Sequence, residues 1–253
     1  MNMKSALNIK SVNKKFDGTV ALDDFSLEIP QNSITGIIGP NGAGKTTLFN
    51  VITGFLPLDS GKIIYNGKNL SRMPSYKIAR AGIARTFQQL RLITRMTVLD
   101  NILLSFQNQA GEYLKNTFLF PGRVKKQERK NREKANELLA FMGIEEKAGD
   151  LVEDLSYGQQ KMISLACCLA SGADLLLLDE PVAGINPSMI EKILMVIKKL
   201  PEAGKTFVII EHNIEAVMRV CDRVIFMDEG KKIAEGDPES VRHDPAVIEA
   251  YLE

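Results

Sequence analysis

The stretch GPNGAGKTT, residues 39–47, constrains the fold of this chain more than any other part of the sequence. It matches the pattern Gly-x-x-x-x-Gly-Lys-Ser/Thr, whose fixed positions are Gly39, Gly44, Lys45 and Thr46. The apolar run SITGIIG before it is typical of a buried strand, and TTLFNVITG after it is typical of a helix. A glycine turn between a strand and a helix presents backbone N–H groups to phosphate oxygens. The sequence therefore predicts a phosphate-binding loop.

Two side chains of this loop suit a nucleotide bound together with magnesium. Lys45 has the length to reach the outer phosphates, and the hydroxyl of Thr46 can hold Mg²⁺. The alternative is a chance glycine turn, which the strand and helix on either side argue against. The residues of the loop that we expect to contact the nucleotide are Gly39, Asn41, Gly42, Ala43, Gly44, Lys45, Thr46 and Thr47.

The rest of the chain alternates between strand-like and helix-like stretches. Short apolar stretches that predict strands occupy residues 6–12, 25–29, 33–39, 59–70, 174–180, 206–212 and 222–230. Helical spacing predominates from about residue 90, and Ala135, Leu138, Leu139 and Met142 share one apolar face. A second helix-like stretch covers residues 188–200. This alternation predicts an α/β core with a mostly parallel sheet, built from both ends of the chain, and a helical insertion in the middle.

Three strands, two of them given above and a further one predicted at residues 82–88, end in polar side chains that suit a magnesium nucleotide. LLLLDE ends in Asp179 and Glu180, FVIIEH ends in His212, and GIARTFQ ends in Gln88. Ligands of open α/β sheets bind beyond the carboxyl ends of the strands, so we expect these groups near the phosphate loop. Taken singly, His212 also fits a hydrogen-bonded loop histidine, and Gln88 also fits a surface amide.

A second loop, DLSYGQQKM at residues 154–162, also opens a helix. Ser156 is a favourable N-cap, and Gly158 allows the backbone to approach an anion closely. A helix from about Gln159 would add its dipole. The plain alternative is a capped helix that binds no ligand.

The phosphate loop, the glutamine loop, LSYGQQ, LLLLDEP and IIEH occur in an order that resembles the ATP-binding subunit of an ABC transporter. The resemblance spans nearly the whole chain. It implies a P-loop NTPase (RecA-like) core, an N-terminal antiparallel β subdomain and an inserted helical subdomain, with ATP and Mg²⁺ as cofactors. On this basis residues 1–88 and 161–236 form the catalytic core with the β subdomain, 89–160 the helical subdomain, and 237–253 a C-terminal extension. The LSYGQ segment of the helical subdomain, residues 155–159, resembles the signature motif of the family and is here called the signature loop.

The resemblance also implies roles for the polar strand ends. Asp179 would bind Mg²⁺ through water, and Thr46 and Gln88 would be the other protein groups at the metal. Glu180 would orient and polarise the hydrolytic water, and His212 would contact the γ-phosphate. Gln88 would also sense that phosphate and couple it to the membrane subunit. The residues expected to act in catalysis are Lys45, Gln88, Glu180 and His212.

Two further nucleotide contacts are implied in the same way. Phe16 in KKFDGTVAL matches the aromatic residue that stacks on adenine, although it also fits a core residue of an edge strand. Ser156, Gly158 and Gln159 would face the ATP held by a second subunit, across a head-to-tail dimer. The two anion-suited loops are visible in the sequence, whereas their arrangement in trans is implied only by the family.

Two positions depart from the commonest pattern of the family. Tyr157 stands where glycine is common in the signature loop, and Asn186 stands where aspartate is commoner. Both variants resemble the subgroup that serves branched-chain amino acid importers, as do ARTFQ and the ending DPAVIEAYLE. The implied function is an ATPase subunit that powers import of a small solute, a branched-chain amino acid in this subgroup.

The implied partners are a second ATP-binding subunit, identical or paralogous, two transmembrane permease subunits, and a solute-binding protein at the outer face. Alternatives within transporters are import of urea or an amide and export of lipid-like cargo. Outside transport, a soluble ABC ATPase of DNA repair or translation is disfavoured by the single cassette and the lack of heptads. A regulatory protein that binds ATP without hydrolysing it is disfavoured by Glu180 and His212.

Charge and composition bear on location. The net charge of +1 provides no global field for nucleic acid, and the basic run at residues 123–134 contains two glutamates and no aromatics, so it predicts a solvated helix face. The first residues lack the apolar core of a signal peptide, and the sparse cysteines suit a reducing compartment. We therefore expect a cytoplasmic protein, held on the inner face of the membrane by the permease subunits. The apolar loop NTFLFPG, residues 116–122, fits either a local tuck or a patch near the membrane partner.

Overall fold

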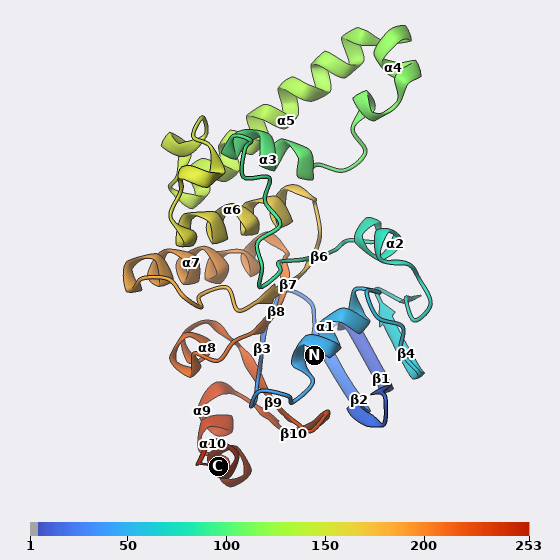
Figure 1. Ribbon diagram of the computed structural model, residues 1–253, viewed down its shortest axis with the longest axis vertical. Coiled ribbons are helices and arrows are strands. Elements are labelled where there is room, and N and C mark those ends of the chain that lie inside the picture. Colours follow the sequence, from blue (N-terminus) through green and yellow to red (C-terminus); the bar gives the residue numbers. More distant parts are fainter. Residues whose placement is uncertain (1–4, 253) are drawn as a thin grey trace. The chain divides into compact units, whose positions relative to one another are not determined.

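The computed structural model describes residues 5–252, without the side chains of 251 and 252, and these residues form two compact units (Figure 1). The first, here called the sheet unit, takes in the chain up to Gln88, Asp174–Ala183 and the residues from Ile197 onward. The second, the helical unit, comprises Gln89–Ala173 and Gly184–Val196. Residues 161–173 and 184–196, which we expected in the catalytic core, thus lie in the helical unit. The division into functional domains stays a prediction.

The larger sheet of the sheet unit has six strands in the order β10-β9-β3-β8-β7-β6. All neighbours are parallel except β10, which pairs antiparallel with β9. Its strands are β3 (Ile34–Ile38), β6 (Ile83–Arg85), β7 (Leu175–Asp179), β8 (Thr206–Ile210), β9 (Arg223–Asp228) and β10 (Lys231–Gly236). Every residue of β3, β7 and β8 is buried, as the continuous apolar runs predict for strands covered on both faces. The mostly parallel sheet is confirmed.

A second, antiparallel sheet has the strand order β2-β1-β4-β5. Its strands are β1 (Ser5–Phe16), β2 (Thr19–Pro30), β4 (Ser60–Tyr65) and β5 (Lys68–Asn69). The register pairs Leu7 with Ile29 and Ile9 with Leu27, so the buried faces of β1 and β2 coincide. The expected antiparallel β subdomain is therefore confirmed.

One apolar core joins the two sheets through the helix that follows the phosphate loop. Helix α1 (Lys45–Ile52) contributes Phe49 to a cluster with Phe25 of the antiparallel sheet and Ile37 of the parallel sheet, all at most 1% exposed. Burying such side chains stabilises the fold by about 1.5–3 kcal/mol each. The core thereby fixes the start of α1, where the phosphate loop ends.

The remaining helices of the sheet unit are short and lie between or after its strands. They are α2 (Ser75–Arg80), α8 (Ile214–Val220), α9 (Pro238–Arg242), α10 (Pro245–Leu252) and the 3-10 turn Pro201–Ala203. Helices α9 and α10 lie against β9 and β10, as Figure 1 shows. The C-terminal stretch thus packs on the strands β9 and β10 of the mostly parallel sheet.

The helical unit is built on α3 (Val98–Ser105), α5 (Pro121–Met142) and α6 (Tyr157–Ala170), which pack on one another. Its other elements are α4 (Leu114–Leu119), most of α7 (Pro187–Lys199) and the 3-10 turns Ala110–Glu112, Glu145–Lys147 and Val152–Asp154. Helix α5 starts at a proline and is followed by Gly143 with φ 64°, and these are the usual start and stop residues of a helix. Within the described part of the chain, no helix is both long enough and apolar enough to cross a membrane.

The apolar stretch NTFLFPG does not tuck into the helical unit. Phe118 is 79% exposed and Leu119 is 69% exposed, and α4 buries none of its residues. The expectation of a local tuck is therefore wrong. These exposed apolar side chains therefore require an explanation other than packing within the helical unit.

Gly36 lies where β3 meets α8, and its position allows a test of this packing. A Cβ atom there would lie 2.9 Å from Cys221 Sγ and 2.9 Å from Val217 Cγ1. We expect Gly36→Ala to lower the free energy of unfolding by about 1–3 kcal/mol through overpacking. Chemical denaturation measures this loss. Gly122→Ala is the matched control, because a Cβ at Gly122 meets no atom within 4 Å; equal stability of the two variants would contradict the prediction.

Candidate functional site

The phosphate loop links β3 to α1 and needs glycine at two positions. Gly39 has φ 152°, and a Cβ there would lie 1.9 Å from the carbonyl oxygen of Met227. Gly44 has φ 94°, and a Cβ there would lie 2.2 Å from the carbonyl oxygen of Ala21. Both positions combine positive φ with a close approach to backbone, which only glycine tolerates. The loop therefore retains an open concave backbone, as phosphate binding requires.

Lys45 folds its amino group back onto this loop. Its Nζ donates to the carbonyl oxygens of Gly39 and Pro40, each at 2.8 Å, and the residue is 6% exposed. Burial lowers the pKa of Lys45, and the carboxylates of Glu180, Asp179 and Asp228 oppose that shift. A desolvated cation held only by carbonyl oxygens is well placed to exchange them for the more negative oxygens of a phosphate.

A pocket of about 190 Å³ opens beside the loop. It is lined by Ala21, Asn41, Gly42, Ala43, Gly44, Lys45, Thr46, Thr47 and His212. The structure thus brings seven consecutive residues expected to contact the nucleotide together with a histidine more than 160 residues away in the chain. Gly39 shapes the loop but is not part of the lining.

Asp179 ends β7 and forms a buried ion pair with Arg85 at the end of β6. Arg85 Nη2 lies 2.7 Å from Asp179 Oδ2, and both side chains are 5% exposed. The other terminal nitrogen of Arg85 donates to Asn50 Oδ1 on α1 at 2.6 Å. The guanidinium also lies over the rings of Phe49 and Phe87, at 5.3 and 5.2 Å from their centroids. Sequence reasoning missed Arg85, although it precedes the predicted site residue Gln88 by only three positions.

Glu180 forms a three-membered cluster with Gln88 and His212. Its Oε1 lies 3.3 Å from His212 Nε2, and its Oε2 accepts a hydrogen bond of 3.3 Å from Gln88 Nε2. Glu180 has φ 48°, a left-handed conformation that is costly for a residue with a side chain. Its N–H donates to the carbonyl oxygen of Ile210 at 2.9 Å, which holds this conformation against β8. Three side chains expected at the site thus converge.

Glu211 stabilises the backbone beside this cluster. Sequence reasoning missed this residue as well. It is 3% exposed, and its Oε1 accepts a hydrogen bond of 2.8 Å from Val182 N. Its Oε2 accepts from the N–H groups of His212 and Asn213 at 3.2 and 3.4 Å. This carboxylate therefore ties the backbone after Glu180 to the backbone at His212. An acidic residue before a predicted site histidine is the only sequence feature that pointed to it.

Phe16 is placed apart from the pocket lining. It is the last residue of β1, 40% exposed, with Lys14 Nζ 5.3 Å from its ring centroid. Its exposure does not fit the alternative of a core residue. An open ring at a strand end is compatible with stacking on a base, and that role stays a prediction.

Magnesium would have few protein ligands at this site. Among the described residues, no group of three or more His, Cys, Asp or Glu side chains is arranged to hold a metal. Mg²⁺ commonly binds through one or two protein oxygens, substrate phosphates and waters, which fits a site consisting of Thr46, Gln88 and Asp179. Burial raises the pKa of the free Cys167, Cys168 and Cys221 thiols, so none suits metal binding as a thiolate.

The signature loop lies in the helical unit and opens α6. Ser156 Oγ accepts from Gln159 N at 3.4 Å, while Gln159 Oε1 accepts from Ser156 N at 2.9 Å, which is a capping box. The predicted N-cap is confirmed. A Cβ at Gly158 would lie 2.7 Å from Met189 Cγ, so this glycine also has a packing role within its own chain. Tyr157 is 45% exposed.

Asn186 has a local structural role in the helical unit. Its Oδ1 accepts hydrogen bonds from Met189 N at 2.9 Å and from Ser188 Oγ at 2.8 Å. An aspartate would accept the same two bonds, so the departure from the common residue preserves the start of α7.

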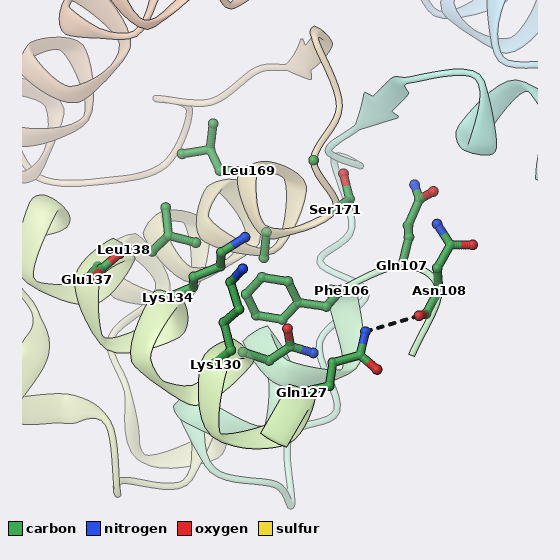
Figure 2. A pocket seen from close by; sticks show the side chains of 13 residues that line it. Phe106, Gln107, Asn108, Gln127, Lys130, Lys134, Glu137, Leu138, Leu169 and Ser171 are labelled. Carbon is green, nitrogen blue, oxygen red and sulfur yellow. Dashed lines mark hydrogen bonds between the residues drawn. The ribbon is translucent and has the colours of Figure 1, made fainter. Parts of the chain in front are cut away.

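A second pocket, of about 750 Å³, lies within the helical unit (Figure 2). Its walls come from the end of α3, the middle of α5 and the end of α6. In Figure 2, Lys130 and Lys134 extend side by side near the ring of Phe106, and Gln127 donates to the carbonyl oxygen of Asn108 at 3.2 Å. This pocket has no glycine-rich phosphate loop, so the nucleotide chemistry belongs to the smaller pocket.

The buried ion pair provides a test of the site's architecture. We expect Arg85→Met to lower the free energy of unfolding by about 3–5 kcal/mol, because Asp179 would be left buried without a cation. Chemical denaturation measures the loss, and Arg85→Lys should recover part of it. Arg129→Met is the control: the Arg129–Glu133 pair is 77% and 64% exposed, so its loss should cost less than about 1 kcal/mol. Equal losses for the two methionine variants would refute the structural role of Arg85.

Comparison with known proteins places the chain in a family. Residues 22–183 match the ABC transporter family, and residues 231–252 match the branched-chain amino acid ATP-binding cassette transporter family. The high-affinity branched-chain amino acid transport ATP-binding proteins BraF of Pseudomonas aeruginosa and LivG of Escherichia coli are 36% and 35% identical to it, each over 97% of both chains.

Solved structures agree with this placement. The ADP conformation of an ATP-binding cassette of an ABC transporter has a TM-score of 0.84 and 32% identity, covering 99% of both chains. A dimeric bacterial ABC transporter cassette has a TM-score of 0.76 and 26% identity, covering 92% of this chain and 98% of that one. The phosphate loop, the converging polar strand ends and these matches lead to one conclusion: the chain belongs to the ATP-binding subunits of ABC transporters, which bind nucleotide and hydrolyse ATP to power transport.

Proposed function

We propose that this chain is the ATP-hydrolysing subunit of an importer for branched-chain amino acids. The observation that carries the catalytic part is the convergence of Gln88 and His212 on Glu180, next to the phosphate loop. The substrate is inferred from the names of the relatives and from the match at residues 231–252. These favour branched-chain amino acids over urea, amides or lipid-like cargo, and favour transport over a soluble role.

Hydrolysis in this proposal depends on positioning and electrostatics. Lys45 and the backbone N–H groups of the loop hold the β- and γ-phosphates. Glu180 orients a water and polarises its O–H bond, and the water oxygen then bonds to the γ-phosphorus while the bond to the bridging oxygen breaks. ADP leaves with that bridging oxygen, one proton of the water stays on the inorganic phosphate, and the other is released to solvent. His212 contacts the γ-phosphate, and its 3.3 Å contact with Glu180 supports joint placement of the two side chains.

Thr46, Gln88 and Asp179 would hold Mg²⁺. When bound, the ion supplies positive charge that neutralises the phosphate oxygens. Oδ2 of Asp179 contacts Arg85, and the carboxylate would bind the metal through water. Arg85 would thus orient the carboxylate, and Phe16 would stack on adenine.

A second subunit would complete each nucleotide site. Ser156, Gly158 and Gln159 would face the ATP of the neighbour, in a head-to-tail dimer of identical or paralogous subunits. Support comes from the capping box, which orders the loop at the start of α6, and from the dimeric cassette with the same fold. The positive end of the α6 dipole would then meet the neighbour's phosphates.

Two transmembrane permease subunits and a solute-binding protein at the outer face would complete the transporter. The names of the relatives, which describe transport ATP-binding proteins, support this assembly. The chain would then work in the cytoplasm, held at the inner face of the membrane by the permease. Gln88 would couple the state of the γ-phosphate to those subunits.

The role of Glu180 predicts a specific loss of turnover. Glu180→Gln keeps the shape of the side chain but removes the carboxylate that polarises water, so steady-state ATPase activity should fall at least about 100-fold. Phosphate release measures the activity, and nucleotide binding should persist. Glu145→Gln, the same change on an exposed residue, should leave the rate unchanged. Unaltered turnover in Glu180→Gln would remove Glu180 from the catalytic role.

The shared site predicts an ATP-dependent dimer. With magnesium-ATP, the Glu180→Gln chain should dimerise in size-exclusion chromatography with light scattering, because ATP stays bound between subunits. Adding Ser156→Tyr should abolish the dimer while the monomer still binds nucleotide, since the serine serves the neighbour's ATP. Ser240→Tyr is the matched control at an exposed serine. A monomer that loses nucleotide binding with Ser156→Tyr, or a dimer that survives it, would contradict the arrangement in trans.

A further inference from the structure

The helical unit carries a cluster of exposed apolar side chains that ATP hydrolysis does not use. It is centred on α4 and is here called the apolar tip. Its members and their exposed fractions are Tyr113 55%, Leu114 78%, Phe118 79%, Leu119 69% and Phe120 55%. Exposed apolar residues that occur singly need no explanation, but five within eight consecutive residues form a patch.

The polar side chains of α4 hold the tip in place from the inner side. Asn116 Nδ2 donates to the carbonyl oxygen of Ala110 at 3.0 Å, and Thr117 Oγ1 donates to that of Gly111 at 3.4 Å. The N–H of Ala110 in turn donates to Gln127 Oε1 on α5 at 2.6 Å. Asn116 is thus half-buried, whereas Leu114, Phe118 and Leu119 of the same helix are exposed. These hydrogen bonds tie α4 to the 3-10 turn Ala110–Glu112, and that turn to α5.

The segment that carries the tip and continues into α5 is positively charged. Residues 111–134 contain eight Lys and Arg against three Glu, a net charge of +5 in a chain whose total is +1. The remaining residues therefore sum to −4, so the positive charge is local to this segment. Lys130 and Lys134 line the pocket of Figure 2, and the other six cations still exceed the three glutamates. All six are exposed: Lys115, Arg123, Lys125, Lys126, Arg129 and Arg132.

We propose that the apolar tip and its surrounding cations bind directly to an anionic lipid surface. Leucine and aromatic side chains beside Lys and Arg are the pattern of helices that lie in the headgroup region of a membrane. Anionic headgroups at the cytoplasmic leaflet attract such basic segments. The apolar side chains would enter the boundary between headgroups and acyl chains, while the cations would contact lipid phosphates.

Charge makes two protein partners of the apolar tip less favourable than lipid, namely the permease and a second copy of this chain. The short cytoplasmic loops of membrane proteins carry an excess of Lys and Arg, which would repel a +5 segment, so the permease is a poorer match. A second copy of this chain that presented the same patch would set like charge against like charge. The proposal goes beyond ATP-driven transport, because it gives the subunit its own contact with the lipid in addition to the permease.

Vesicle co-sedimentation tests the proposal with the full chain. We expect binding to vesicles of phosphatidylglycerol and phosphatidylcholine but not to pure phosphatidylcholine, with weaker binding as salt rises from 0.1 to about 0.5 M. Phe118→Ser with Leu119→Ser should weaken binding at least about tenfold by removing buried apolar area. Phe141→Ser, also at an exposed aromatic on the helical unit, should leave binding unchanged.

Reversing the charge of two neighbouring lysines tests the electrostatic part of the proposed lipid binding. Lys125→Glu with Lys126→Glu should abolish binding to anionic vesicles, whereas Lys198→Glu with Lys199→Glu, the same change of charge at exposed residues of α7, should have little effect. ATPase activity should be unaltered in all four variants, since none of these residues lies in the nucleotide site. Normal ATPase activity also shows that a variant has folded.

Three outcomes would overturn the proposal. The first is equal binding to neutral and anionic vesicles, or no binding to either. The second is that the unaltered chain binds no lipid, while Phe118→Ser with Leu119→Ser abolishes the complex with detergent-solubilised permease. That result would assign the apolar tip to a protein contact. The third is a change of oligomeric state in that variant, which would assign the tip to a second copy. Vesicle binding requires no ATP hydrolysis, so failure here is distinct from failure of the proposed transport function.

Discussion

The buried ion pair between Arg85 and Asp179 is the interaction on which the geometry of the nucleotide site depends. Through 2.7 and 2.6 Å contacts, one guanidinium joins β6, β7 and α1 at the carboxyl edge of the parallel sheet. The aromatic rings of Phe49 and Phe87 keep water from that guanidinium. A desolvated pair of this kind is costly to break, although forming it gains little. It therefore orients Asp179 rigidly next to the phosphate loop.

The other polar groups of the site depend on this rigid edge. Glu180 follows Asp179 directly, and its left-handed backbone turns its carboxylate toward His212 and Gln88. Glu211 holds the backbone on both sides of that turn with buried hydrogen bonds. The strain at Glu180 is thus sustained by its surroundings, as is common where a side chain must be aimed at a reacting group.

Much of the nucleotide site was predictable because its parts are local in sequence. The phosphate loop needs only consecutive residues with particular backbone freedom, so the pattern from Gly39 to Thr46 identified it. Parallel strands end at one edge of a sheet, which explains why Gln88, Glu180 and His212 could be expected together. Sequence reasoning missed Arg85 and Glu211 because the role of each depends on the residues that it contacts in the fold. Asp179, for example, lies 94 residues from Arg85 in the chain. For Phe118 and Leu119 the sequence left burial and an exposed patch both open, and the fold decided for exposure.

By itself, the sequence determined the α/β class, the phosphate loop, the capped signature helix and the family, because strand period, glycine spacing and helix caps are local properties. Tertiary structure alone decided which buried charges pair, which backbone turn is strained, and which apolar side chains face outward. These outcomes depend on desolvation and on contacts between segments far apart in the chain. No short stretch of sequence specifies them, since the free energy of each depends on what the fold places around it.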